Sequence, residues 1–250
     1  MEGAAYGNWV SLWLIIGPAI LGAAFAGATA AVRWLGVLTA FFAFVSGYFA
    51  YARWAFSPGG RDIQNRMLAL VTAHLRDWSG EGKVLDVGCG DGALAIRIAK
   101  DNPDAHVLGV DKWGANWEFS RRRCEDNAAA EGVGNRVSFE DADAASLPFD
   151  DAAFDAVVSN FVFHEVRSVS DKRRLLQEAL RVLKPGGVFV FQDLFLWRRV
   201  YGPIDGLLQT LRGWGIGTVG FVDTSRSSFI PRALKLPFML GTAGILYGKK

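Results

Sequence analysis

The segment Val84-Leu85-Asp86-Val87-Gly88-Cys89-Gly90-Asp91-Gly92 decides the fold. It begins with three aliphatic side chains and one carboxylate, a composition typical of a short strand buried on both faces. Three glycines follow, and glycine allows the tight turns and close backbone approach that other residues resist. The apolar stretch after them predicts a helix, whose first backbone N–H groups lack partners within the helix. A strand, a glycine turn and a helix in this order predict a site for a nucleotide-like ligand.

Strands and helices alternate on both sides of this segment. We expect strands over residues 84–87, 106–110, 137–140, 154–160, 188–193, 219–223 and 244–248. We expect helices over residues 62–78, 93–100, 116–130, 171–182 and 204–214. This alternation predicts an α/β fold with a parallel sheet and helices on both faces. Ligands of such sheets lie outside the carboxyl ends of the strands, where the strand order reverses.

The glycines alone leave two kinds of ligand open. Gly88, Gly90 and Ala93 also fit the G-x-G-x-x-A fingerprint of dinucleotide-binding proteins. Asp86 separates the alternatives, because a carboxylate beside the turn repels a pyrophosphate but pairs with an ammonium group. The segment therefore favours a cofactor that carries an amino-acid moiety, with a nicotinamide enzyme as the alternative.

Five ordered motifs resemble those of class I S-adenosylmethionine-dependent methyltransferases. They are VLDVGCGDG (84–92), VLGVD (107–111), DAASLPF (143–149), FDAVVSN (154–160) and RVLKPGG (181–187). The resemblance implies a Rossmann-like, mostly parallel seven-stranded sheet with the last strand inserted antiparallel, and S-adenosylmethionine as cofactor. The LPF and LKPGG sequences are most similar to enzymes that methylate small molecules, including quinones, sterols and lipids.

The resemblance also implies which residues bind the cofactor. Asp86, Gly88 and Gly90 would hold its methionine part, with Cys89 as a small residue inside the turn. A nucleophilic role for Cys89 would need a basic partner, and its neighbours are acidic. Asp111 would accept both ribose hydroxyls, since a carboxylate suits this bidentate geometry.

The remaining cofactor residues lie at or near the adenine end. Asp143 would accept from the exocyclic amine beside Ala144. Lys112 and Trp113 directly follow the ribose-binding position and could cover the adenine face, although ordinary packing explains the tryptophan equally well. Asn160 ends the fourth expected strand and is assigned to the same site. The residues that follow it do not match the N-P-P-Y type of sequence found in enzymes that methylate amino groups of DNA and some proteins. The resemblance therefore disfavours a nucleobase acceptor.

Three residues are candidates for catalysis, and we assign no metal site. Methyl transfer from a sulfonium is an in-line displacement, so positioning matters more than a strong catalytic group. A base helps where the nucleophile is a phenol or a protonated amine, and His164 lies just after the fourth expected strand. Glu165 is its neighbour, and Asp193 ends the fifth expected strand. A structural hydrogen bond is the alternative role for His164.

The first sixty residues differ in composition from the rest. They hold three of the 52 charged side chains, and Arg33 separates two apolar runs at residues 9–30 and 34–53, the second uncharged up to its last residue, Arg53. Each run is about long enough to cross a hydrocarbon core of about 30 Å as a helix. We therefore expect a two-helix transmembrane hairpin within residues 1–56.

The expected boundaries follow from this hairpin. Ser57, Pro58 and two glycines break the second helix, which gives a linker at residues 57–61 and an enzyme domain at residues 62–250. Three arginines after the second run, against one in the turn, place the termini and the enzyme domain in the cytoplasm. A re-entrant element, or an apolar hairpin buried in an oligomer, stays open because Pro18 makes the first helix kinkable. An n-region that carries Glu2 instead of a lysine or arginine, and the second apolar run, argue against a signal peptide.

Charge and composition limit the kinds of partner that the protein is expected to bind. The net charge is +2 with no basic block, which argues against a nucleic acid partner. Residues 228–240 mix large apolar side chains with Arg232 and Lys235, which suits either a lid at the bilayer interface or a buried connection. We expect a cytoplasm-facing, membrane-anchored methyltransferase acting on a small lipophilic acceptor, such as a quinone precursor or a lipid. The alternatives are a soluble metabolite or a membrane protein as acceptor, or a non-catalytic cofactor-binding scaffold.

Overall fold

The computed structural model describes residues 3–114 and 119–250 and divides them into two compact units. Residues 8–67 form one unit, here called the helical unit. Residues 3–7 and 68–250 form the other, here called the sheet unit. The N-terminal segment thus belongs with the sheet, although it precedes the first apolar helix in sequence.

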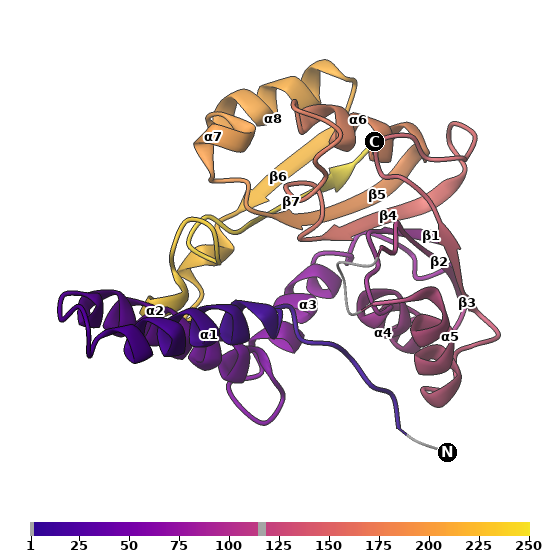
Figure 1. The fold of residues 1–250 in the computed structure, drawn as a ribbon. Helices are drawn as coiled ribbons and strands as arrows, with labels where there is room; N and C mark the ends of the chain where they lie inside the picture. The colour runs from indigo at the N-terminus through magenta and orange to yellow at the C-terminus, as the bar shows by residue number, and fades with distance from the viewer. Residues whose placement is uncertain (1–2, 115–118) are drawn as a thin grey trace. The chain divides into compact units, whose positions relative to one another are not determined.

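Within the described residues, the sheet unit contains one seven-stranded sheet (Figure 1). Its strands are β1 (Gly82–Val87), β2 (Ala105–Asp111), β3 (Val137–Asp141), β4 (Phe154–Asn160), β5 (Leu183–Asp193), β6 (Thr218–Val222) and β7 (Gly244–Lys249). The spatial order is β3-β2-β1-β4-β5-β7-β6, and only the pairs made by β7 are antiparallel. The predicted mixed sheet with its last strand inserted antiparallel is confirmed. The order reverses between β1 and β4, which places a ligand site at their carboxyl ends.

Helices cover both faces of this sheet (Figure 1). The helices of the sheet unit are α4 (Ala93–Asp101), α5 (Arg121–Ala130), α6 (Arg173–Arg181), α7 (Arg198–Tyr201) and α8 (Ile204–Gly213), with 3₁₀ turns η1 (Thr224–Arg226) and η2 (Arg232–Leu234). The α3 helix (Ile63–Ala73) begins in the helical unit and ends in the sheet unit. The α4 and α5 helices lie on one face, and α6 and α8 lie on the other. Ser120 begins α5 by accepting a hydrogen bond from the backbone of Arg123 at 3.3 Å. The earlier start expected for this helix includes residues 116–118, which lie outside the described residues.

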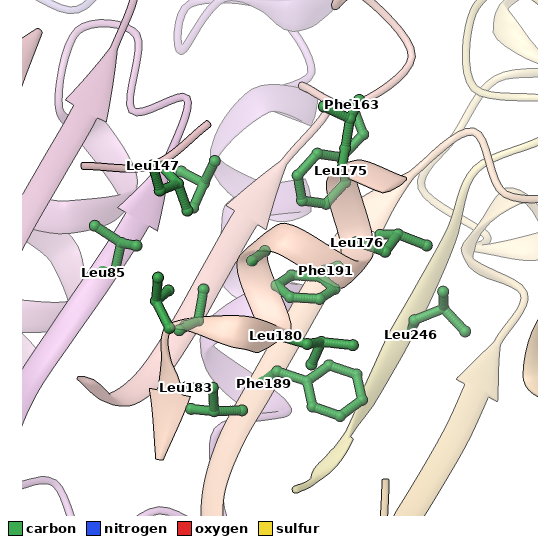
Figure 2. Close-up of a cluster of buried hydrophobic side chains, with 14 of the residues drawn as sticks. Leu85, Leu147, Phe163, Leu175, Leu176, Leu180, Leu183, Phe189, Phe191 and Leu246 are labelled. Atoms are coloured by element: carbon green, nitrogen blue, oxygen red, sulfur yellow. The ribbon is translucent and has the colours of Figure 1, made fainter. Parts of the chain in front are cut away.

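The larger hydrophobic core lies between the sheet and α6 (Figure 2). Leu176 and Leu180 of α6 face Phe189 and Phe191 of β5, and the core extends to Leu246 of β7. Burying each of these side chains contributes about 1.5–3 kcal/mol. Because successive strand residues point to opposite faces, the residues between these core positions point away from α6.

The helical unit is a pair of apolar helices, α1 (Trp13–Ala28) and α2 (Leu35–Phe56). The hydroxyl of Ser46 donates to the carbonyl of Ile15 at 2.9 Å, and the rings of Phe25 and Phe42 stack at 5.6 Å. Gly22 lets the helices approach closely, since a Cβ there would lie 3.4 Å from Phe42. The predicted hairpin of helices therefore forms.

The first helix is shorter than predicted. Among the described residues, only α2 is both long and apolar enough to cross a membrane, whereas α1 has 16 residues and is about 24 Å long. The segment before α1 instead folds back on the end of α2: the side-chain amide of Asn8 donates to the carbonyl of Arg53 at 2.9 Å, and the Arg53 guanidinium donates to Val10. These bonds hold residues 8–10 outside the helix, so the prediction of two spanning helices is not supported.

Candidate active site at the carboxyl ends of the strands

The glycine turn after β1 is held in a conformation that requires glycine. Gly88, Gly90 and Gly92 have φ of +76°, +59° and +83°, the left-handed region that other residues rarely adopt. A Cβ at Gly88 would also lie 2.2 Å from a methyl carbon of Val162. The backbone N–H of Gly88 donates to the carbonyl of Val110 at 2.7 Å, which ties the turn to β2. The turn therefore requires glycine both for its backbone conformation and for the close packing of Val162.

Asp86 is a buried carboxylate without a hydrogen-bond partner. Its side chain is 1 % exposed, and neither oxygen has a partner in the described part of the chain. Burial, reinforced by the nearby Asp111 carboxylate, raises the pKa of Asp86 to about 8. A cationic group placed here would offset both effects. The residue thus fits the ammonium group of the methionine part of S-adenosylmethionine.

Asp111 at the end of β2 is oriented by the glycine turn. One carboxylate oxygen accepts the backbone N–H of Gly90 at 2.8 Å, and burial raises the pKa of this carboxyl group. The indole N–H of Trp113 donates to the carbonyl of Gly90 at 2.9 Å. Both predicted residues therefore lie against the same turn, in positions that fit a ribose and its attached base.

The residues predicted to bind the adenine already make contacts within the protein. One oxygen of Asp143 pairs with the Lys112 ammonium at 3.1 Å, and the other accepts the backbone N–H of Ala145 at 2.9 Å. These contacts lower the pKa of Asp143, so it stays ionised. Ala144 is half-buried beside the apolar core. An exocyclic amine would share Asp143 with Lys112.

Cys89 is placed as a small residue inside the turn. Both cysteines are free and buried, and the Cys124 thiol donates to the carbonyl of Gly90 at 3.2 Å. Burial and the neighbouring Cys124 raise the pKa of the Cys89 thiol well above its usual value. A thiol that stays protonated is a poor nucleophile.

The turn after β4 carries backbone strain next to the glycine turn. Phe161 has φ of +56°, which is uncommon for an aromatic residue, and its N–H donates to the carbonyl of Gln192 at 2.7 Å. The next residue, Val162, is the one that packs on Gly88. Strain of this kind persists where the surroundings fix it and often marks a functional site. It positions Asn160 and His164 on either side of the bend.

His164 lies between two carboxylates. Its Nδ1 is 2.6 Å from Oδ1 of the fully buried Asp193, and its Nε2 is 3.3 Å from Oε1 of Glu165. Burial lowers the pKa of His164, but the two carboxylates outweigh it and raise the pKa to about 10. The ring therefore holds a proton on both nitrogens at neutral pH. Burial, together with Asp193, also raises the pKa of the nearby Tyr201.

The predicted site residues gather in three neighbouring groups at one end of the sheet. Asp86, Asp111 and Trp113 surround the glycine turn at β1 and β2. Lys112 and Asp143 pair beyond β2, and His164, Glu165 and Asp193 meet at β4 and β5. Phe195 and Tyr201, which follow β5, are buried in the core. The roles of all these residues stay predictions.

Several residues were not anticipated from the sequence. Asp91 accepts the backbone N–H of Gly7 at 2.6 Å, and Asn127 accepts that of Ala5 at 2.8 Å, so the N-terminal segment lies beside the glycine turn. No local pattern predicts such a contact, because 84 residues separate Gly7 from Asp91. Gln192 was detectable in principle, as a polar residue after four residues of apolar strand.

Comparisons with known proteins agree with this geometry. A family described as methyltransferase domain matches residues 84–187. The 27-O-demethylrifamycin SV methyltransferase of Amycolatopsis mediterranei is 35 % identical over 141 residues, which are 56 % of this chain and 48 % of that protein. The demethylmenaquinone methyltransferase of Thermus thermophilus is 33 % identical over 172 residues, which are 65 % of this chain and 73 % of that protein. The chain thus spans about half the length of the first relative and most of the second.

A solved structure shares the fold. The crystal structure of the [4+2]-cyclase SpnF has a TM-score of 0.56 at 26 % identity, covering 74 % of this chain and 80 % of that one. That protein is named for a cyclisation, so the fold by itself does not specify the reaction.

The sheet order, the glycine turn, the buried Asp86 and the half-buried Asp111 define a class I S-adenosylmethionine-dependent methyltransferase fold. With the family match and the 33 % identity to a relative of which 73 % is covered, the chain belongs to the methyltransferase family. Its residues fit S-adenosylmethionine as the cofactor.

Proposed function

We propose that this protein is a membrane-associated methyltransferase that transfers the methyl group of S-adenosylmethionine to a small lipophilic acceptor, with a quinone precursor as the leading class. The observation that carries the reaction is the unpartnered, buried Asp86 beside a glycine turn and Asp111. The relative named for demethylmenaquinone supports the acceptor class.

The chain's own residues have to bind, orient and exclude water. Asp86 would hold the ammonium group, Asp111 the ribose hydroxyls, and Trp113 would lie near the base. When bound, the sulfonium supplies an already activated methyl group, so the acceptor atom bonds to that carbon as the carbon–sulfur bond breaks and the acceptor loses a proton. Near-attack geometry is then the main requirement.

His164 is suited to activate a hydroxyl on the acceptor. Because Asp193 and Glu165 keep its ring protonated, it adds a positive charge beside the strand ends. A nearby positive charge favours the anion of an acceptor hydroxyl and lowers its pKa. In this role the Nε2–H of His164 exchanges its 3.3 Å contact with Glu165 for the acceptor oxygen and keeps its own proton, which differs from the general-base role predicted from the sequence.

The apolar helix α2 supports membrane association. Large apolar side chains along it are exposed, with Val37 and Phe44 each 73 % exposed. A monomeric soluble protein rarely exposes such a surface. We propose that α2 enters the bilayer with α1 packed along it, and that the sheet unit faces the cytoplasm.

The direct test uses full-length protein in nanodiscs with S-adenosylmethionine and reduced demethylmenaquinone. Mass spectrometry should detect a product heavier by one methylene unit. Asp86→Asn and Asp111→Asn should abolish it, while Gln177→Asn, an exposed position on α6, should not. Methylation only of water-soluble metabolites would contradict the lipophilic acceptor, and no methylation of any extract component would favour a cofactor-binding scaffold.

A further inference from the structure

A row of polar side chains at or near the carboxyl ends of the strands carries buried oxygen or nitrogen atoms that have no hydrogen-bond partner in the described part of the chain. It contains Asp86, Asn160, Gln192 and Thr224. Gln192 is 0 % exposed and Thr224 is 2 % exposed, and the Oδ1 atom of Asn160 is buried. In the described part of the chain, both amide atoms of Gln192 and the hydroxyl of Thr224 lack partners. Buried polar groups are nearly always paired, so each exception calls for a ligand, a water or a function.

Strand register places these residues side by side. Asn160 of β4 is the partner of Gln192 in β5, and Asp86 of β1 is the partner of Val158, two residues earlier in β4. All three alternate with residues that face the α6 core, so they point to the opposite face of the sheet. Thr224 begins the 3₁₀ turn η1, two residues after the end of β6, and Val222 of β6 is joined to the Gln192 position through Ile245 of β7.

The row begins at the cofactor and leads away from it. Asp86 would hold the ammonium group, and the other three side chains extend across β4 and β5 towards β6. Adjacent strands lie about 4.8 Å apart, so Asn160 and Gln192 are direct neighbours. Neither unpaired oxygen accepts from the other residue's amide. Both therefore keep hydrogen-bonding capacity for a third group.

The chemistry of the row specifies that group. The oxygens of Asn160 and Gln192 can only accept, so the ligand must carry a donor. The Gln192 amide nitrogen and the Thr224 hydroxyl can donate in return. Beyond Asp86 the row has no charged side chain, and burial of a charged ligand would need a partner of opposite charge. The ligand group is therefore neutral and carries at least one hydrogen-bond donor, which in the proposed quinol acceptor is a hydroxyl.

We propose that Gln192, with Asn160 and Thr224, forms the subsite that binds the neutral, hydroxyl-bearing head group of the methyl acceptor. The subsite rests on the proposed function, because it orients the acceptor beside the cofactor. It lies on the opposite sheet face from the His164 and Asp193 pair, so binding and activation of the acceptor use separate residues.

The test compares Gln192→Met with Gln177→Met in the full-length protein. Methionine has nearly the length of glutamine and cannot form its hydrogen bonds. With reduced demethylmenaquinone as the probe, Gln192→Met should raise the acceptor KM about tenfold, the effect of losing one or two neutral hydrogen bonds. The Kd of S-adenosylhomocysteine should stay unchanged in Gln192→Met. Gln177→Met should keep the wild-type acceptor KM and the wild-type Kd. Thr224→Val should raise the same KM.

Stability provides the second measurement, and it needs no acceptor. Since the Gln192 amide is unpaired without ligand, Gln192→Met should melt at the same temperature as wild type or higher. A lower melting temperature, or an unchanged acceptor KM in both variants, would overturn the subsite. If the wild-type protein does not methylate the quinol, the quinone proposal fails. Methyl transfer by the variants and by wild type is then measured with a total lipid extract and with an aqueous extract. Variants that transfer as much methyl as wild type in both extracts overturn the subsite.

Discussion

The Asp86 carboxylate lowers the stability of the cofactor-free fold but favours binding of the cofactor. A buried, desolvated carboxylate destabilises the cofactor-free protein, whereas the same group would pair with the cofactor's ammonium. We predict that Asp86→Asn weakens binding of S-adenosylhomocysteine about a hundredfold, because a desolvated charge pair is lost. The melting temperature should stay the same or rise. Isothermal titration calorimetry and thermal unfolding measure the two effects, and unchanged binding would contradict the assignment.

The raised pKa of Asp86 also predicts a pH dependence with a definite sign. The carboxyl group has an ordinary pKa of 3.8 and a folded pKa of about 8, so between these values the folded state binds more protons than the unfolded state. This group therefore makes the cofactor-free protein less stable as pH rises from about 4 to about 8. Binding of an ammonium releases that proton, so affinity should rise towards pH 8. If the stability and the cofactor affinity of Asp86→Asn change with pH as much as those of wild type, this explanation is contradicted.

His164 makes a separate prediction for the pH–rate profile. Its pKa of about 10 means that its stabilising pairing is complete below pH 6.5 and is lost as pH rises through 10. The rate should therefore show no rising limb near pH 6.5. In Asp193→Asn the pKa of His164 should fall, and His164→Gln should lower kcat about a hundredfold. A wild-type rate that rises with an apparent pKa near 6.5, absent in His164→Gln, would instead support the general-base role.

The glycine turn and the turn after β4 act together as elements. Gly88 fits only because it has no Cβ against Val162 and adopts a positive φ. We predict that Gly88→Ala destabilises the protein by roughly 2–4 kcal/mol, from backbone strain and overpacking. Denaturant unfolding measures this, with Gly213→Ala as the control because that position has open space and no positive φ. Equal effects of the two substitutions would contradict the role of this contact.

The sequence predicts the sheet elements well because their signals are local. The apolar strands 84–87 and 154–160 and the helix that begins at Ala93 occur close to where periodicity and glycine place them. Residues 198–201 were missed as a helix because four residues are too short to show a period. Helix α1 was predicted too long because composition alone does not reveal the hydrogen bonds of Asn8 and Arg53.

The site was predictable only where it follows strand ends. Asp111 and Asp193 end strands, Asp86 precedes the last residue of β1, and His164 lies four residues after β4. Parallel topology brings such positions together. The contact of Gly7 with Asp91 has no such signal, because it depends on the long-range path of the chain. The charge state of His164 was also missed, because it requires the distances to two carboxylates.

At the scale of the whole molecule, α2 should determine membrane association. A lysine near the middle of a spanning helix costs about 2.5–3.5 kcal/mol. We predict that Phe44→Lys moves much of the protein from the membrane pellet to the supernatant, while Gln177→Lys does not. Carbonate washing and immunoblotting of the fractions measure this. Equal retention of both variants would show that the apolar helices serve another purpose, such as packing in an oligomer.

The most direct measurement of the central claim follows a methyl label. Full-length protein in nanodiscs is incubated with methyl-labelled S-adenosylmethionine and a whole-cell extract, and the organic and aqueous phases are counted separately. We predict label in the organic phase that is lost in Asp86→Asn and Asp111→Asn. Label confined to the aqueous or protein fraction, or organic label that persists in both variants, would contradict a lipophilic acceptor methylated at this site.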